Sequence, residues 1–316
     1  MNEKEARIKF AAAAILILVF LSMLVSLREE FCLSRHTPPV GFMDKWYNDC
    51  NLVAAGDSRT TLSIDPDQLV KNKKFRGVNF GFNGNALSEN YLNKINMLLS
   101  PRKPNVIVFG ITPHMFVPHA FKDNEFLHYK PPSIGERIFS WSFGSKWHTF
   151  SIMTVNEIRY YLTGGDFQLP MKMIRHSNGW LAASENNSDD ESKTLKDYER
   201  HFQFGPVKPD VMQQFFDRVK KWSSKGIVII GFRPPTTENM VKLENRLSGF
   251  DESEFVQKFE QAGGYWINVP QYNVYRCYDG SHITADSAKD LSDKLCAEIC
   301  SLIPQLKSTL CAPDNG

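Results

Sequence analysis

The chain has 316 residues, of which 42% are hydrophobic and 23% are charged, a composition typical of a globular protein and not of a fibrous or disordered one. The formal net charge at pH 7 is only +2, so we expect no basic surface for nucleic acid and no nucleic-acid partner. The length allows one large domain or two small ones.

The amino-terminal residues predict a signal anchor. Residues 10–27 contain neither charge nor proline, and a helix of this length crosses a hydrocarbon core of about 30 Å. Three basic residues precede this run and only Arg28 closely follows it, which predicts a cytoplasmic amino terminus and a remainder exported to the periplasm, a lumen or the outside. A cleaved signal peptide is the alternative, although its apolar region would be unusually long. We therefore expect residues 1–30 to be a cytoplasmic tail and one transmembrane helix.

The rest of the chain alternates between strand and helix signals after a linker at residues 31–49. Short apolar runs typical of buried strands lie at residues 52–55, 75–80, 106–109, 227–230 and 265–269. Helix starts are expected at Asp65, Ser88, Pro209, Thr237, Ser253 and Thr284. Strands separated by helices in this way predict an α/β fold with a parallel sheet covered on both sides, a three-layer sandwich.

One long segment interrupts this alternation. Residues 114–208 are rich in aromatic residues and follow the carboxyl end of the third expected strand. We interpret them as an insertion within a domain that spans residues 50–316. Two interpretations stay open: a lid or cap that binds substrate, and a structural elaboration that touches no ligand.

The cysteines and glycines give no sign of a cofactor. Six cysteines permit disulfides on the exported side but leave buried free thiols equally open. Cys296 and Cys300 are close in sequence but no histidine lies near them, so metal binding is the weaker interpretation. The glycines match no nucleotide-binding motif. We expect neither a metal nor an organic cofactor.

Two turns carry residues that suit nucleophilic catalysis. The first expected strand runs into Gly56-Asp57-Ser58, and the segment before the last helix contains Asp279 and His282, three residues apart. The carboxyl ends of parallel strands lie at one edge of a sheet, where open α/β folds hold their active sites. A carboxylate that holds one imidazole nitrogen, with the other facing a serine hydroxyl, forms a catalytic triad. The sequence therefore predicts a triad at this edge.

With these residues the chain resembles the SGNH or GDSL-type hydrolases. The resemblance rests on Gly56-Asp57-Ser58, on the block from Val78-Asn79 to Gly84 after the second strand, and on Asp279-Gly280-Ser281-His282. It covers the order of elements from about residue 50 to residue 303, outside the insertion, and implies the flavodoxin-like sandwich of that family. It implies Ser58 as nucleophile, His282 as general base, Asp279 as its orienting acid and the N–H of Gly84 as an oxyanion donor.

This chain departs from the family's pattern at the third block. The family has GxND there, and its asparagine completes the oxyanion hole, whereas this chain has Gly110-Ile111-Thr112-Pro113. One missing oxyanion donor costs about a hundredfold to a thousandfold in rate. We expect either that Thr112 or Asn85 substitutes for it or that activity is weak.

Three further residues are candidates for binding substrate. Arg59 takes the place of the leucine in GDSL and is expected at the rim of the site, facing an anionic group. Arg233 follows the fourth expected strand and either binds an anion or makes a structural ion pair. His114 either lines the pocket or is a packed side chain.

The combination of an anchor, an insertion and no asparagine in the third block looks like the membrane-anchored branch of the family. That branch includes alginate-type O-acetyltransferases and the D-alanyl transfer protein of teichoic acids. The resemblance implies an acyltransferase or esterase that acts on a cell-surface polysaccharide or glycan. It also implies a membrane acyl carrier protein as partner and contact with the lipid bilayer through residues 10–27. The alternative is a non-catalytic binding or accessory module that kept the fold.

Overall fold

The computed structural model describes residues 49–102, 104–129, 171–176, 178–185 and 191–311, together with residues 5, 9, 10, 12–17 and 20. All but the last residue of the expected linker, and most of residues 10–27, lie outside these ranges. Within the described ranges, no helix is both long enough and apolar enough to cross a membrane. The transmembrane helix and the domain boundaries therefore stay predictions.

The centre of the fold is a five-stranded parallel sheet, as predicted. In chain order its strands are β1 (Leu52–Gly56), β2 (Gly77–Asn79), β3 (Val106–Gly110), β6 (Val228–Phe232) and β7 (Tyr265–Trp266). Their order across the sheet is β2-β1-β3-β6-β7, and every neighbouring pair is parallel. The chain leaves β1 toward β2 on one side and returns to β3 on the other. This change of direction is where open α/β sheets form crevices for ligands.

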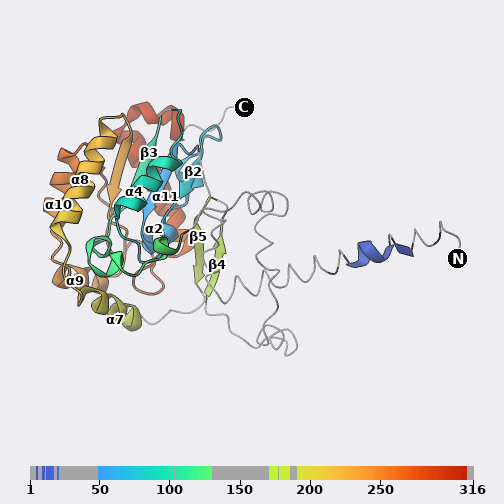
Figure 1. The fold of residues 1–316 in the computed structure, drawn as a ribbon, viewed down its shortest axis with the longest axis horizontal. Helices are drawn as coiled ribbons and strands as arrows, with labels where there is room; N and C mark the ends of the chain where they lie inside the picture. The colour runs from blue at the N-terminus through green and yellow to red at the C-terminus, as the bar shows by residue number, and fades with distance from the viewer. Residues whose placement is uncertain are drawn as a thin grey trace.

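Helices cover both faces of the sheet (Figure 1). Alternate strand residues point to opposite faces, so the strands contribute to two cores. One core holds Val53, Ala55, Ile107, Phe109 and Ile229, and the other holds Leu52, Ala54, Val106, Val108 and Ile230.

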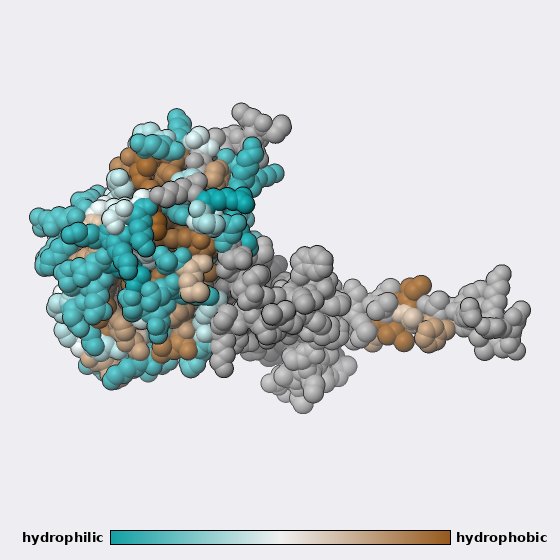
Figure 2. Space-filling model, turned by 45° about the horizontal axis from the view of Figure 1, so that its top comes forward, coloured by the Kyte–Doolittle hydropathy of each residue, from teal (hydrophilic) through white to brown (hydrophobic). Residues whose placement is uncertain are grey.

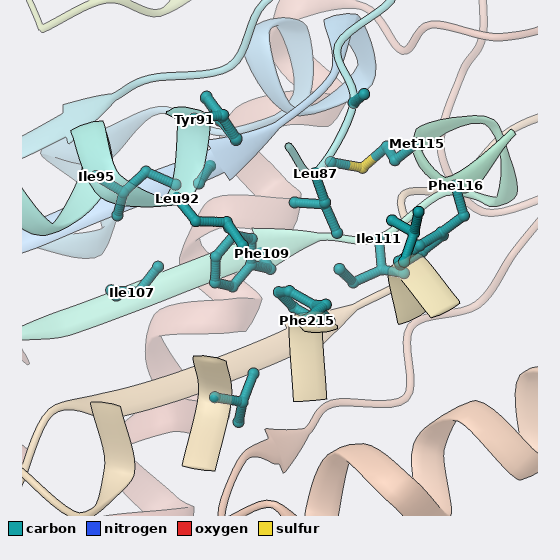
Figure 3. Close-up of a cluster of buried hydrophobic side chains, with 14 of the residues drawn as sticks. Leu87, Tyr91, Leu92, Ile95, Ile107, Phe109, Ile111, Met115, Phe116 and Phe215 are labelled. Carbon is teal, nitrogen blue, oxygen red and sulfur yellow. The ribbon is translucent and has the colours of Figure 1, made fainter. Parts of the chain in front are cut away.

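The first core packs against α4 (Glu89–Leu98), α8 (Pro209–Ser223) and α10 (Glu252–Gln261), and the second packs against α3 (Pro66–Leu69) and α11 (Ala285–Leu302). Figure 3 shows the first core, in which Phe109 of β3 lies against Phe215 of α8 with ring centroids 5.1 Å apart. The two cores fix the sheet between two layers of helices.

Polar caps begin the helices where the sequence places them. The side chains of Asp65, Ser88 and Thr237 each accept a hydrogen bond from the first turn of the following helix. The helix expected near Ser253 starts slightly earlier, because Asp251 is its cap and accepts from the N–H of Glu254. These caps supply acceptors for N–H groups that a helix itself leaves unpaired.

The described ends of the insertion pack onto the domain. They comprise the 3-10 helices η1 (Pro113–Phe116), η2 (His119–Phe121) and η3 (Glu125–His128), an antiparallel hairpin of β4 (Met171–Arg175) and β5 (Leu181–Glu185), and α7 (Glu191–Phe202). Trp180 belongs to the α11-side core and donates from its indole to the carbonyl of Leu62, while Tyr198 and Phe202 of α7 belong to the other core. These ends therefore share cores with the sheet.

The cysteines differ from one another. Cys300 is disulfide-bonded, whereas Cys277 is a free thiol. Burial raises the pKa of Cys277 to about 12, with a further contribution from the nearby Asp279. Cys32 lies outside the described residues.

Candidate active site

A tight turn after β1 presents the serine. The strand ends at Gly56, and α2 (Ser58–Ser63) begins two residues later with Asp57 as its cap. A Cβ on Gly56 would lie 2.0 Å from Thr60 Oγ1 and 2.8 Å from the carbonyl oxygen of Gly110. Only glycine therefore allows the turn to close so near β3. Ser58 is the first residue of the helix and stays partly exposed.

A second turn, before α11, holds the histidine. The Asp279 carboxylate accepts hydrogen bonds from the backbone N–H groups of Ser281 at 2.9 Å and His282 at 2.7 Å. Gly280 has φ of +88°, a backbone conformation that glycine adopts without strain. The N–H of Tyr278 donates to the carbonyl of His282 and closes the loop. The carboxylate therefore shapes the turn that carries the imidazole.

The two turns meet at the carboxyl edge of the sheet. His282 Nε2 lies 2.8 Å from Ser58 Oγ, and His282 Nδ1 lies 2.6 Å from Asp279 Oδ2. The ring of Tyr278 stacks on the imidazole at a centroid distance of 6.0 Å and an interplanar angle of 21°. Both hydrogen bonds are within the reach that a general base and its orienting acid require. The structure thus brings together the three residues of the predicted triad.

The charge state of Asp279 suits this orientation. Its burial favours the neutral acid, but the charge of His282 and hydrogen bonds from its ring and from two backbone N–H groups outweigh that effect and lower the pKa of Asp279. An ionised carboxylate accepts the proton on Nδ1. The hydrogen-bond network then assigns the lone pair of Nε2 to the side that faces the Ser58 hydroxyl.

The two side chains expected at the oxyanion hole are buried and donate hydrogen bonds within the fold. Thr112 is completely buried, and its hydroxyl donates to Asp57 Oδ2 at 2.6 Å. Asn85 is also completely buried, and its amide donates to the carbonyl of Gly56 at 3.1 Å. The single hydroxyl proton of Thr112 is thus committed to Asp57. The Asn85 amide has a second N–H beyond the one that Gly56 accepts, so its role as an oxyanion donor stays a prediction.

Two backbone N–H groups are further candidates for the oxyanion hole. Gly84 follows β2 with φ of +62°, and Ser58 is the first residue of α2, where a backbone N–H has no partner within the helix. No hydrogen bond between described residues uses either N–H. Both groups follow strands that end at the edge where the triad lies.

Arg59 does not lie at the rim of the site. It is 1% exposed, and its Nη2 lies 2.7 Å from Glu244 Oε1 in a buried ion pair. Its Nε donates to Ser281 Oγ at 3.0 Å. Burial opposes the charge of Arg59, but Glu244 more than compensates and raises the pKa of the guanidinium. Arg59 is buried and not at the rim because α9 (Glu238–Leu247) brings the buried carboxylate of Glu244 to this position.

Of the two roles expected for Arg233, anion binding and a structural ion pair, the structure shows the ion pair. Arg233 is 3% exposed, and its guanidinium lies 2.8 Å from Glu244 Oε2 and 2.6 Å from Glu252 Oε2. Its charge is therefore compensated by two carboxylates. It is not available to an anionic substrate.

His114 is a packed side chain and not part of an open pocket. It is 3% exposed, with its ring centroid 4.9 Å from that of His201 and 5.7 Å from that of Tyr198. Burial, with smaller contributions from His201, Arg59 and His119, lowers the pKa of His114 to about 3. No group of three or more potential ligands among the described residues is arranged to hold a metal ion.

Three residues beside the triad were not found from the sequence: Glu244, Ser281 and Tyr198. For Glu244 a signal exists, because it shares the inner face of α9 with Met240 and Leu243 at helical spacing. A carboxylate on a buried face implies a buried cation. The hydroxyls of Ser281 and Tyr198 carry no such signal, since their contact depends on elements far apart in the chain.

The comparisons with known proteins define no family. No protein-family model matches the chain, and no curated protein matches it in sequence. Among solved structures it resembles a chain described as a putative platelet activating factor from Streptococcus pneumonia, with 12% identity, a TM-score of 0.37 and coverage of 90% of this chain and 99% of that one.

It also resembles a carbohydrate acetylesterase family member from Sinorhizobium meliloti, with 12% identity, a TM-score of 0.35 and coverage of 80% and 99%. A third structure is the acetyl xylan esterase Est2A from Butyrivibrio proteoclasticus, with 8% identity, a TM-score of 0.31 and coverage of 82% and 65%. At these TM-scores the overall likeness is weak, so it identifies neither a family nor a substrate.

Proposed function

We propose that this chain is a serine esterase or acyltransferase that works through an acyl-serine intermediate. The observation that carries the proposal is the pair of hydrogen bonds that links Ser58 Oγ to His282 Nε2 at 2.8 Å and His282 Nδ1 to Asp279 Oδ2 at 2.6 Å. A nucleophile, a base and an orienting acid in this order activate a serine hydroxyl. Their place at a sheet edge, beside a change in strand direction, gives a substrate access to them.

The first half of the proposed reaction acylates the serine. His282 Nε2 takes the proton of the Ser58 hydroxyl as Oγ attacks the carbonyl carbon of an ester. The carbonyl oxygen becomes an oxyanion, stabilised by the backbone N–H groups of Ser58 and Gly84. The bond to the leaving alcohol then breaks, and the alcohol takes the proton from His282. Asp279 holds the imidazole in orientation and stabilises its transient positive charge.

The second half removes the acyl group. A hydroxyl oxygen attacks the acyl carbon and gives its proton to His282, and the bond to Ser58 Oγ breaks as that proton returns to the serine. Water as the acceptor yields an esterase, and a sugar hydroxyl yields a transferase. We propose a glycan or polysaccharide at the cell surface as the acceptor, with a membrane acyl carrier protein as the donor for a transferase.

We propose that residues 10–27 hold the protein at a membrane and that the domain lies on the exported side. The support is the uncharged sequence of this run and the basic residues before it. Among the described residues of this region, the large apolar side chains are 59% to 78% exposed: Phe10, Ile15, Leu16, Ile17 and Phe20. Figure 2 draws the described part of this stretch in brown and paler brown. Such exposure of apolar side chains is typical of segments with a membrane or protein partner.

A non-catalytic SGNH-like binding module is the second candidate. It is favoured by one observation, the hydrogen bonds that commit the donors of Thr112 and Asn85 to Asp57 and Gly56. With these donors in use, an oxyanion depends chiefly on backbone N–H groups. A fold that binds an acyl or sugar group without turnover would show the same bonds.

Hydrolysis of 4-nitrophenyl acetate by the full chain in detergent separates the two candidates. We expect measurable kcat/KM for wild type and a loss of at least about a thousandfold in Ser58→Ala. Ser63→Ala is the matched control, because Ser63 lies in the same helix with a buried hydroxyl that has no hydrogen-bond partner among the described residues. Equal rates for wild type and Ser58→Ala would favour the binding module. Product analysis with added oligosaccharide then distinguishes a transferase from an esterase.

A further inference from the structure

The sequence neighbours of the nucleophile and of the base contact each other in the interior of the domain. Arg59 follows Ser58, and Ser281 precedes His282. Arg59 Nε donates to Ser281 Oγ at 3.0 Å, and both residues are 1% exposed. One hydrogen bond thus joins two turns that come from opposite ends of the domain, one residue away from each reacting side chain.

The backbone on both sides of this bond is fixed. Arg59 lies in the first turn of α2, and its own N–H donates to Asp57 Oδ1 at 3.0 Å. The N–H of Ser281 donates to Asp279 Oδ1 at 2.9 Å. A displacement of Arg59 or Ser281 is therefore passed directly to its neighbour in the triad.

Buried groups also hold the guanidinium from the other side. Its carbon lies 4.9 Å from the ring centroid of Tyr198, whose hydroxyl accepts a hydrogen bond from Ser281 Oγ at 3.0 Å. Glu244 lies between Arg59 and Arg233, and Arg233 also contacts Glu252. Because a guanidinium is planar and presents its donors in a rigid fork, contacts on several sides leave it one orientation.

We propose that Arg59 and Ser281 are positioning residues that set the separation of Ser58 Oγ and His282 Nε2. The inference rests on the proposed function, because it gives these residues a role in the same triad. Neither side chain touches the reacting atoms. They act by holding α2 and the turn at residues 279–282 at a fixed spacing, and displacements of about 1 Å near a reacting centre cost on the order of a hundredfold in rate.

Ser281→Ala is the direct test, because it removes the bond to Arg59 and leaves the ion pair of Arg59 with Glu244 in place. The full chain is assayed with 4-nitrophenyl acetate and, separately, for its rate of inactivation by a fluorophosphonate. We expect kcat and the inactivation rate to fall by about tenfold to a hundredfold, with KM changed less than about twofold. Ser281→Thr keeps the hydroxyl, and we expect it to recover most of the wild-type rates.

Ser292→Ala is the matched control. Ser292 is also a buried serine, and its hydroxyl accepts from the N–H of Asp65 and donates to the carbonyl of Ala288, away from the triad. We expect wild-type rates for this variant. Equal losses in Ser292→Ala and Ser281→Ala would assign the effect to general destabilisation and contradict the positioning role.

The remaining outcomes separate this inference from the proposed function. A reactive wild type together with an equally reactive Ser281→Ala overturns the inference alone. A Ser281→Thr variant as slow as Ser281→Ala also contradicts it. A wild type that neither hydrolyses the ester nor reacts with the fluorophosphonate overturns the proposed function, and the inference with it.

Discussion

Ser58 and Arg59 are adjacent in sequence, yet their side chains belong to two different regions of the molecule. Ser58 faces His282 in a partly exposed group of three polar side chains. Arg59 points into a buried network with Glu244 and Arg233, where all three residues are at most 3% exposed. The first region is partly accessible to solvent and suited to chemistry, and the second is buried and holds charges in fixed positions.

The difference shows that a polar motif at a strand end serves two purposes in this fold. Removing one residue of the triad takes away a reacting or orienting atom but leaves no uncompensated charge in the core. Removing one member of the buried network leaves an uncompensated charge, which costs several kcal/mol. We therefore expect changes in the first region to act on rate, and changes that leave a charge of the second region uncompensated to act mainly on stability.

The largest expected effect is on the rate of Asp279→Asn. An asparagine oxygen still accepts the backbone N–H groups of the turn, but its NH₂ faces His282 Nδ1 and forces the ring proton onto Nε2. The imidazole then has no lone pair for the Ser58 proton. We expect kcat for ester hydrolysis to fall about ten-thousandfold, with unfolding by urea little changed. A decrease of less than tenfold would remove Asp279 from the triad.

Glu244→Gln tests the buried network. The variant leaves the charges of Arg59 and Arg233 without their shared carboxylate, and we expect a loss of about 3 to 5 kcal/mol in the free energy of unfolding. Glu254→Gln is the control, since Glu254 pairs with Lys258 on an exposed face and its loss is expected to cost less than about 1 kcal/mol. Urea unfolding measures both. Similar costs for the two variants would contradict the distinction between the regions.

Thr112→Val separates a structural role from a catalytic one. It removes the hydrogen bond to the buried Asp57, and we expect a loss of about 1 to 3 kcal/mol in the free energy of unfolding. We expect the decrease in kcat to be less than tenfold, whereas loss of an oxyanion donor costs about a hundredfold or more. Paired urea and rate measurements decide between the two roles. A hundredfold decrease in kcat would restore Thr112 to the oxyanion hole.

The smallest expected effect concerns pH and His114. Its pKa in the folded protein is about 3, below the 6.5 of an exposed histidine, so between these values the unfolded chain binds the extra proton. The stability from this group is complete above pH 6.5 and is lost as the pH falls toward 3. Between these pH values, His114 contributes up to about 1.4 kcal/mol per pH unit to the change in the free energy of unfolding.

In His114→Gln we expect a smaller loss of stability on acidification than in wild type, measured by urea unfolding at pH 7 and pH 5. The variant removes the group that titrates, while His119, His201 and Arg59 remain as in wild type. An unchanged difference between the two pH values would show that His114 does not titrate in this way.

Most of the fold follows from local sequence patterns. Short apolar runs identified the five strands of the sheet, and helix starts at Asp65, Ser88 and Thr237 followed from capping residues that act on their own first turn. Such signals need no knowledge of distant contacts. The alternation of strands and helices then left a parallel sheet as the arrangement that buries every strand.

The site divides between what is local and what is not. Asp279 and His282 share one turn, so their relation is visible in the sequence. Arg59 is buried because it pairs with Glu244, and the Thr112 hydroxyl is occupied because it donates to Asp57. Only the folded chain brings these partners close to each other. The same holds for the hydrogen bond from Asn85 to the carbonyl of Gly56, which the sequence does not reveal.

Ser58 is the proposed nucleophile. The most direct test of this assignment is to treat the full chain with a fluorophosphonate, digest it and locate the adduct by mass spectrometry. We expect one adduct per chain on the peptide that contains Ser58, and none in His282→Ala after the same exposure. An adduct on another residue, or ester hydrolysis that persists without modification of Ser58, would contradict it.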